Sequence, residues 1–385
     1  MKIDPYNHKE RYFKWKESSK NGIEGISKMN SDLVKRYLMN MECGINVSSK
    51  SSKGSRSFVR LNTLRNRILF CVKKFEEIYK ACDVTKMNEE QIVLFFSRMR
   101  GGEIKRNDGK TYTSVGDYVK VFQAFWHWHQ KVCKKEGVDV PDITIDLDST
   151  TPKPKWVYLD EKQVKKLCDA VKPEYKVLLM FLFDSGIRSP TELINVKVSD
   201  FYNNFKEVNI REEISKTFGR RIKLMICPDL IKEYVAEKKL KSRDYIFPIN
   251  PPATNQYIKR VAKRIFGSSV SQAGQKYSDL TLYDFRHISC CYWLPRYKSE
   301  SALKYRFGWK KSEKIHYYSE LLGMKDTIAE EDMLVDVTKT EIEKRLTITE
   351  RENSLLKEQV KDMQGQLQEI LKRVNGVYYQ VKEDC

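Results

Sequence analysis

The sequence has few of the features that mark membrane, secreted or metal-binding proteins. No apolar run approaches the roughly 20 residues that a membrane-spanning helix needs, and the first stretch, MKIDPYNHKERYFKWK, lacks the apolar core of a signal peptide. The nine cysteines form no CxxC pair, and the neighbours Cys290 and Cys291 lie in an apolar segment where we expect them to pack. The five histidines have no metal-ligand spacing. We therefore expect a protein of the reducing cytoplasm with no metal site.

Positive charge is what the chain has in excess. Lysine and arginine number 71 against 52 aspartate and glutamate, which gives a formal net charge of +19 and a pI near 9.3. Such a field favours a polyanionic partner, most often nucleic acid, with general solubility or weak membrane attraction as the alternative. At 385 residues the chain exceeds one typical core, so we expect two domains and an appendage.

The N-terminal part predicts an all-helical domain behind a short arm. Residues 1–22 are charged and aromatic without clear periodicity, which indicates an arm. Apolar residues then recur at helical spacing across residues 23–141, where we predict a bundle of about four or five helices. The last of these helices carries an aromatic stripe that we interpret as core and not as a base-stacking platform: Tyr118, Phe122, Phe125, Trp126 and His129.

Two segments interrupt the apolar periodicity. The stretch NVSSKSSKGSRS is rich in Ser, Lys and Gly. It is either a plain linker or a mobile loop whose Lys50, Lys53 and Arg56 contact phosphates. Prolines and polar residues over 142–156 mark a linker between two domains.

Residues 157–333 predict a second, α+β domain that is mainly helical with one small sheet. LDEKQVKKLCDAV and EYKVLLMFLFDSGIRSPTELINV have helical patterns, and residues 281–294 form a strongly apolar helix. KEVNIREEISKTFGRRIKLMI alternates and contains Gly219, which predicts strands joined by a turn.

Residues 334–385 predict a coiled-coil tail. Two sets of residues fall seven apart and are offset to give a heptad seam: Leu346, Asn353, Val360, Leu367 and Val374, and Ile342, Thr349, Leu356, Met363 and Ile370. Asn353 occupies a seam position, where a buried amide sets register and favours two strands. A helix folded back along its own chain would also show an apolar stripe, but the strict seven-residue period favours self-association.

The second domain also contains an ordered series of phosphate-seeking residues. Arg188 follows a helix break in DSGIRSPTEL, and Lys216 stands beside the predicted turn in SKTFGRR. Arg286 and His287 begin the apolar helix of TLYDFRHISCCYWL, and FGWKKSEKIHYYSELLG contains Trp309 and two adjacent tyrosines. Each feature is weak alone, since a basic chain has many solvated arginines. In this order the series resembles the tyrosine recombinase, or phage integrase, family. Its sequence motifs look most like those of archaeal virus and plasmid integrases.

The resemblance implies a role for each of these positions. Arg188 and Arg286 match the family's two catalytic arginines, and Lys216 matches the lysine of the sheet turn. Trp309 falls where the family has a histidine or tryptophan, and the spacing from it selects Tyr318, not Tyr317, as the nucleophile. The first domain is then similar to the family's core DNA-binding domain. The basic residues expected to contact DNA are Lys50, Lys53, Arg56, Arg220 and Arg221. The coiled coil lies outside the common family pattern.

Three positions depart from the family pattern or add to it. Tyr283 stands where the family usually has a histidine or lysine, three positions before Arg286. A phenol there can donate one hydrogen bond to a phosphate but brings no charge. Glu192 lies one residue further from Arg188 than the usual acidic residue and is a candidate to orient it. His287 either replaces part of the missing histidine's role or packs.

The family chemistry explains why these residue types are needed. Two arginine forks match the non-bridging oxygens of a phosphodiester and stabilise transition-state charge without a metal. Tyr318 attacks, Lys216 protonates the leaving 5′ oxygen, and a 3′-phosphotyrosyl link conserves the bond energy, so no cofactor is expected.

The resemblance implies a site-specific recombinase of a mobile element, acting on double-stranded attachment sites as a tetramer in the host cytoplasm. The alternatives are a type IB topoisomerase-like nicking and resealing enzyme, and a DNA-binding regulator with a decayed pocket, which Tyr283 alone favours.

Overall fold

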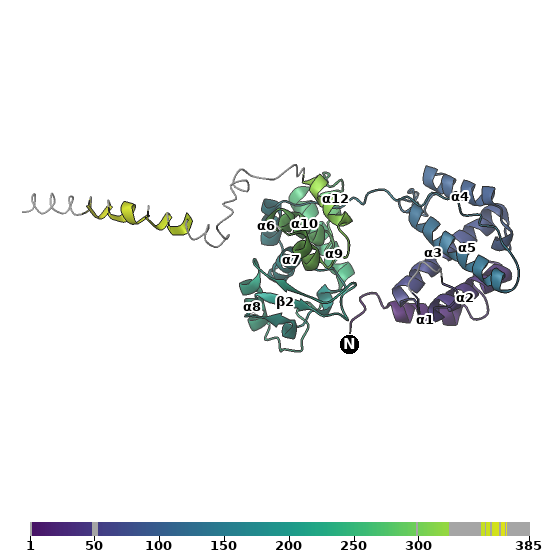
Figure 1. Ribbon diagram of the computed structural model, residues 1–385, viewed down its shortest axis with the longest axis horizontal. Helices are drawn as coiled ribbons and strands as arrows, with labels where there is room; N and C mark the ends of the chain where they lie inside the picture. Colours follow the sequence, from purple (N-terminus) through teal and green to yellow (C-terminus); the bar gives the residue numbers. More distant parts are fainter. Residues whose placement is uncertain are drawn as a thin grey trace, which may run out of the picture. The chain divides into compact units, whose positions relative to one another are not determined.

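The computed structural model describes residues 2–47, 53–297 and 299–322, and in the tail residues 348–350, 352–354, 356–361, 363–365 and 367. The chain divides into two units, Met1–Leu322 and Gly323–Cys385. Within the first unit, a purely helical group precedes in sequence a group that combines helices with a small sheet (Figure 1).

The helical group contains five α-helices among the described residues: α1 (His8–Ser18), α2 (Lys28–Cys43), α3 (Phe58–Tyr79), α4 (Glu89–Gly101) and α5 (Val115–Lys135). The prediction of an arm over residues 1–22 is wrong for α1, which packs against α3. Tyr12 of α1 is buried, and its ring centroid lies 5.9 Å from that of Phe58.

Aromatic side chains fill the core of the helical group. Phe122, Phe125 and Trp126 of the predicted stripe are buried, which confirms their interpretation as core. Phe122 packs edge-on against Phe75 of α3, and Tyr37 of α2 packs edge-on against Phe125. Edge-to-face pairs of this kind add about 0.5–1.5 kcal/mol each beyond the burial of their area.

The second group begins after the predicted linker, and the part of it that the structure describes contains ten elements besides short 3₁₀ turns: α6 (Glu161–Ala170), α7 (Pro173–Ser185), β1 (Phe201–Tyr202), β2 (Glu207–Ile210), β3 (Arg220–Lys223), α8 (Pro228–Glu237), α9 (Pro251–Phe266), α10 (Asp284–Trp293), α11 (Glu300–Phe307) and α12 (Glu313–Leu321). Helix α7 is apolar around most of its circumference because it is covered by α6, α8 and α10. It is the central element of this group.

The three strands form an antiparallel sheet in the order β1-β2-β3. In its register Val208 pairs with Ile222, and Ile210 pairs with Arg220. Side chains of a strand alternate between faces, and β3 accordingly buries Arg220 and Ile222 while Arg221 is exposed. The predicted strands are present, and the connection between β2 and β3 spans residues 211–219.

The described residues of the tail are helical. Its seam positions in that part are exposed by 47% to 59%: Leu356, Val360, Met363 and Leu367. The seam positions Ile342, Leu346, Ile370 and Val374 lie outside the described residues. None of the helices in the part of the chain that the structure describes is both long and apolar enough to cross a membrane.

Candidate active site

Three contacts between elements build one pocket from the predicted residues. Helix α10 packs against α7, which brings Arg286 beside the segment that follows α7. Helix α11 contacts β3, and α12 contacts α10, so Tyr318 reaches His287. The resulting pocket of about 330 Å³ is lined by Arg188, Lys216, Thr217, Tyr283, Arg286, His287, Gly308, Trp309, Lys310, Lys311, Glu313 and Tyr318. All positions to which the resemblance gives a catalytic role therefore lie together.

Glu192 holds Arg188 in this pocket despite the extra residue between them. The Arg188 backbone N–H donates to Oε2 of Glu192 at 2.8 Å, and its Nη1 donates to Oε1 at 2.9 Å. Its Nη2 donates to the carbonyl of Gly308 at 2.9 Å. These bonds fix the guanidinium at the pocket wall, with part of its surface left for a ligand.

Arg220 differs from its expected role. Its side chain is buried, its Nη2 pairs with Oε2 of Glu192 at 2.8 Å, and its Nε donates to the carbonyl of Arg306. A guanidinium in this position cannot reach a DNA duplex, so the prediction that Arg220 contacts DNA is wrong. Arg220 instead neutralises Glu192. Burial alone would raise the pKa of that carboxyl, but hydrogen bonds and charge from Arg220, with further help from Arg188 and Arg286, lower it to about 2.

Arg286 is buried at the floor of the pocket. Its Nη1 donates to the carbonyl of Gly186 at 2.7 Å, and its Nη2 donates to the carbonyl of Phe307. Burial, and then the positive charge of Arg188, lower the pKa of Arg286 to about 10, so it stays charged at neutral pH. Gly186 ends α7 in the left-handed region at φ 63°, and a Cβ there would stand 2.3 Å from the Phe307 ring. Only glycine fits this position.

The two adjacent tyrosines have different surroundings. Tyr318 is 2% exposed, and its ring stacks on that of Trp309 with 5.8 Å between the ring centroids. Its hydroxyl lies 2.5 Å from Nδ1 of His287. Burial raises the pKa of Tyr318 well above its ordinary value. The hydroxyl of Tyr317 instead donates to the carbonyl of Pro154 at 2.7 Å and accepts from Nε1 of Trp156 at 2.6 Å. Tyr318 therefore faces the pocket, and Tyr317 fastens the end of the linker.

The remaining predicted residues are distributed between the pocket rim and other surfaces. Lys216 is exposed on the β2–β3 connection, and Tyr283 is 47% exposed at the start of α10. Arg221 lies over the ring of Tyr202 at 4.3 Å on the exposed face of the sheet. Lys53 and Arg56 lie between α2 and α3, and Lys50 is outside the described residues.

Several residues outside the predicted set also contact the site. Thr217 donates from its hydroxyl to the Gly308 carbonyl at 2.9 Å, and Lys310 and Lys311 line the pocket. Trp156 stacks on His287 at a centroid distance of 4.8 Å. The double lysine after Trp309 was a visible signal, whereas the Trp156 contact has no local sequence pattern.

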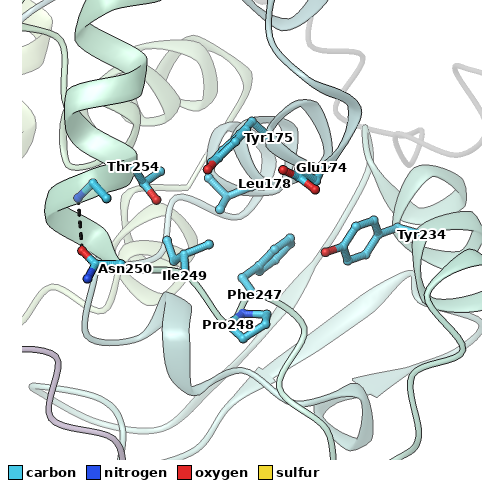
Figure 2. A pocket seen from close by; sticks show the side chains of 10 residues that line it. Glu174, Tyr175, Leu178, Tyr234, Phe247, Pro248, Ile249, Asn250 and Thr254 are labelled. Carbon is cyan, nitrogen blue, oxygen red and sulfur yellow. Dashed lines mark hydrogen bonds between the residues drawn. The ribbon is translucent and has the colours of Figure 1, made fainter.

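A second pocket, of about 290 Å³, lies at the other end of α7 (Figure 2). Its walls include Tyr175, Leu178, Tyr234 and Phe247, and its charged lining residue is Glu174. A carboxylate without a basic partner in the lining repels phosphate, so this pocket does not suit the predicted chemistry. Among the described residues, no group of three or more His, Cys, Asp or Glu side chains could hold a metal ion.

Comparison with solved structures defines the fold. The Tn1549 transposon integrase in complex with transposon right end DNA matches with a TM-score of 0.56 at 11% identity, over 80% of this chain and 98% of that one. A lambda integrase dimer bound to a COC′ core site matches with a TM-score of 0.55 at 13% identity, over 77% and 98%. A lambda integrase tetramer bound to a Holliday junction gives 0.53 at 13% identity, over 78% and 80%. No family model and no curated protein matches the sequence. The chain has the fold of the tyrosine recombinases.

Proposed function

We propose that this chain is a site-specific DNA recombinase that cuts and rejoins strands through Tyr318. The observation that carries the proposal is the convergence of two arginines, a lysine and a buried tyrosine in one pocket: Arg188, Arg286, Lys216 and Tyr318. A pocket with this set of side chains suits a phosphodiester, because the cations offset its charge while the phenol attacks.

In the proposed cleavage each of these pocket residues has one role. Arg188 and Arg286 bind the non-bridging oxygens of the scissile phosphate, and the indole N–H of Trp309 and the phenol of Tyr283 donate further hydrogen bonds. The Tyr318 hydroxyl gives up its proton to a base as its oxygen attacks phosphorus, the bond from phosphorus to the 5′ oxygen breaks, and Lys216 gives that oxygen a proton. A free 5′-hydroxyl from another strand reverses these steps and reseals the DNA without a cofactor.

Assembly on DNA is proposed from the same likeness. The lambda integrase structures are described as a dimer on a core site and a tetramer on a Holliday junction, and we propose a tetramer on two attachment sites here. Lys50, Lys53, Arg56 and Arg221 are proposed to contact phosphates. The resemblance to archaeal virus and plasmid integrases extends the proposal to integration or excision of a mobile element, with the tail joining protomers.

The proposal is tested by covalent capture. A pool of nicked duplexes, randomised around the nick, is incubated with wild type, Tyr317→Phe and Tyr318→Phe, and protein–DNA adducts are separated on a denaturing gel. The nick releases a short strand after cleavage, so the phosphotyrosyl adduct accumulates. We expect the adduct with wild type and Tyr317→Phe and none with Tyr318→Phe, because only Tyr318 faces the arginines.

Other outcomes assign other functions. Loss of the adduct in Tyr317→Phe alone would give the nucleophile to Tyr317. Relaxation of a supercoiled plasmid without joining of two DNA molecules would indicate a topoisomerase with the same chemistry. Tight, salt-sensitive DNA binding without any adduct from wild type would indicate a regulator that has lost catalysis.

A further inference from the structure

His287 makes the contact that a proton acceptor for Tyr318 requires. Its Nδ1 lies 2.5 Å from the Tyr318 hydroxyl, within hydrogen-bond reach. Tyr283, where related enzymes usually have a basic residue, cannot take this role because a neutral phenol is a poor proton acceptor near pH 7. Burial also raises the pKa of Tyr318, so its attack needs help in losing the proton.

The ring of His287 is held on two sides. The ring of Trp156 stacks on it with 4.8 Å between the ring centroids and an interplanar angle of 29°. The ring of Tyr283 packs edge-on against it, with 5.2 Å between the centroids. Trp156 is in turn fixed, because its indole N–H donates to Tyr317 and the Tyr317 hydroxyl donates to the Pro154 carbonyl. This arrangement, from the end of the linker to α12, keeps the imidazole against the nucleophile.

The other groups in the pocket are less suited to accept this proton. Arg188 and Arg286 have no acceptor atom, and Lys216 is the proposed acid for the leaving oxygen. Glu313 is the carboxylate among the lining residues that the structure describes, and it pairs with Lys311 at 3.3 Å on the exposed rim. Cys290 and Cys291 of α10 are buried and are not among the residues that line the pocket.

We infer that His287 is the general base of strand cleavage, an inference that rests on the proposed recombinase function. With its Nε2 protonated, Nδ1 takes the phenolic proton as the Tyr318 oxygen bonds to phosphorus and the bond from phosphorus to the 5′ oxygen breaks. The leaving oxygen takes a proton from Lys216. His287 ends as imidazolium and Lys216 as a neutral amine, and resealing returns both protons. Trp156 acts through His287 and is a positioning residue.

The experiment separates the base from the acid by changing the leaving group. Wild type, His287→Asn and Lys216→Ala are given a duplex recovered from the adduct pool, once with a normal phosphodiester and once with sulfur in place of the bridging 5′ oxygen. A thiolate leaves without a proton because thiols are far stronger acids than alcohols. His316→Asn is the matched control, since His316 is an exposed histidine on the same helix as Tyr318.

We expect His287→Asn to form the adduct about 100-fold or more slowly on both substrates, the usual contribution of a general base. Lys216→Ala should be slow on the normal substrate and recover on the sulfur substrate, and His316→Asn should match wild type. Imidazole added to His287→Ala should restore part of the rate, an effect that a purely structural role would not produce.

Two results would overturn the inference while leaving the recombinase proposal intact. One is a wild-type rate for His287→Asn, and the other is recovery of His287→Asn on the sulfur substrate, which would move His287 to the leaving-group side. Absence of any adduct from wild type would instead remove the proposed function and this inference together. The unfolding midpoint and DNA affinity of each variant, measured alongside, separate chemistry from folding.

Discussion

Glu192 is a single carboxylate that holds two arginines, and its protonation should couple stability to pH. Its pKa in the folded protein, about 2, is below the ordinary 4.5. The stabilisation is therefore complete above pH 4.5 and is lost as the pH falls from 4.5 towards 2. We expect Glu192→Gln to lower the free energy of unfolding at pH 7 by on the order of 3 kcal/mol, because Arg220 stays buried without its counter-charge.

Urea unfolding at stepped pH checks this expectation. Wild type should lose stability steeply between pH 4.5 and 2, and Glu192→Gln should lose less over the same interval. Glu213→Gln is the control, because Glu213 forms an ion pair with Arg211 at the surface, where such pairs contribute little. Parallel curves for wild type and Glu192→Gln would show that the lowered pKa is not a stability determinant.

Individual site residues were predictable where order and spacing carry information. Arg188, Lys216, Arg286 and Tyr318 lie in one pocket, as their order in the sequence suggested. The basic character of Arg220 predicts a surface contact with DNA, whereas its alternation with Ile222 along the strand indicates burial, as the structure has it. The contact between Trp156 and Tyr317 joins residues 161 apart in sequence, and no local pattern could reveal it.

Among the elements of the second group, a buried ion pair joins three segments that frame the site. Asp184, near the end of α7, accepts from the backbone N–H groups of residues 225–227 through Oδ2. Its Oδ1 pairs with Nη2 of Arg306 at 3.0 Å, and Arg306 also donates to the carbonyl of Lys223. The end of α7, the segment after β3 and α11 are thereby held together.

Removing this carboxylate should destabilise the whole second group. We expect Asp184→Ala to lower the free energy of unfolding by about 3–5 kcal/mol, because it leaves a buried guanidinium without its counter-charge and three backbone donors without an acceptor. Asp169→Ala, which breaks an exposed pair with Lys176, should change it by about 0.5 kcal/mol or less. The measurement is urea unfolding at neutral pH. Equal effects of the two substitutions would contradict a stabilising role for the buried pair of Asp184 and Arg306.

Secondary structure was predictable where the apolar period was strong. Helices α2 to α5 and the strands β2 and β3 follow the patterns in the sequence. Helix α1 is not predictable from an apolar pattern, because Tyr12 is its one buried residue. The rest of the segment is mostly charged or exposed and shows little helical periodicity. Its position is decided by tertiary packing against α3, which a local pattern does not contain.

At the scale of the whole molecule, the net charge and the tail suggest how the chain assembles. A charge of +19 makes free protomers repel one another in low salt and attracts polyanions such as the proposed DNA substrate. Self-association therefore needs a contact strong enough to offset this repulsion. The exposed apolar positions Leu356, Val360, Met363 and Leu367 can supply it if they pair between chains.

The tail prediction is tested by changing its seam in the full chain. Wild type should form dimers at micromolar concentration without DNA, Leu356→Asp should be monomeric, and Asn353→Ile should shift towards trimers or tetramers, since a seam asparagine favours two strands. Lys357→Ala, next to the seam, is the control and should remain dimeric. Sedimentation equilibrium at several concentrations distinguishes these states. A wild type that stays monomeric throughout would contradict self-association through the tail and favour the alternative, a helix folded back along its own chain. Under the proposed function, assembly of the tetramer would then require DNA.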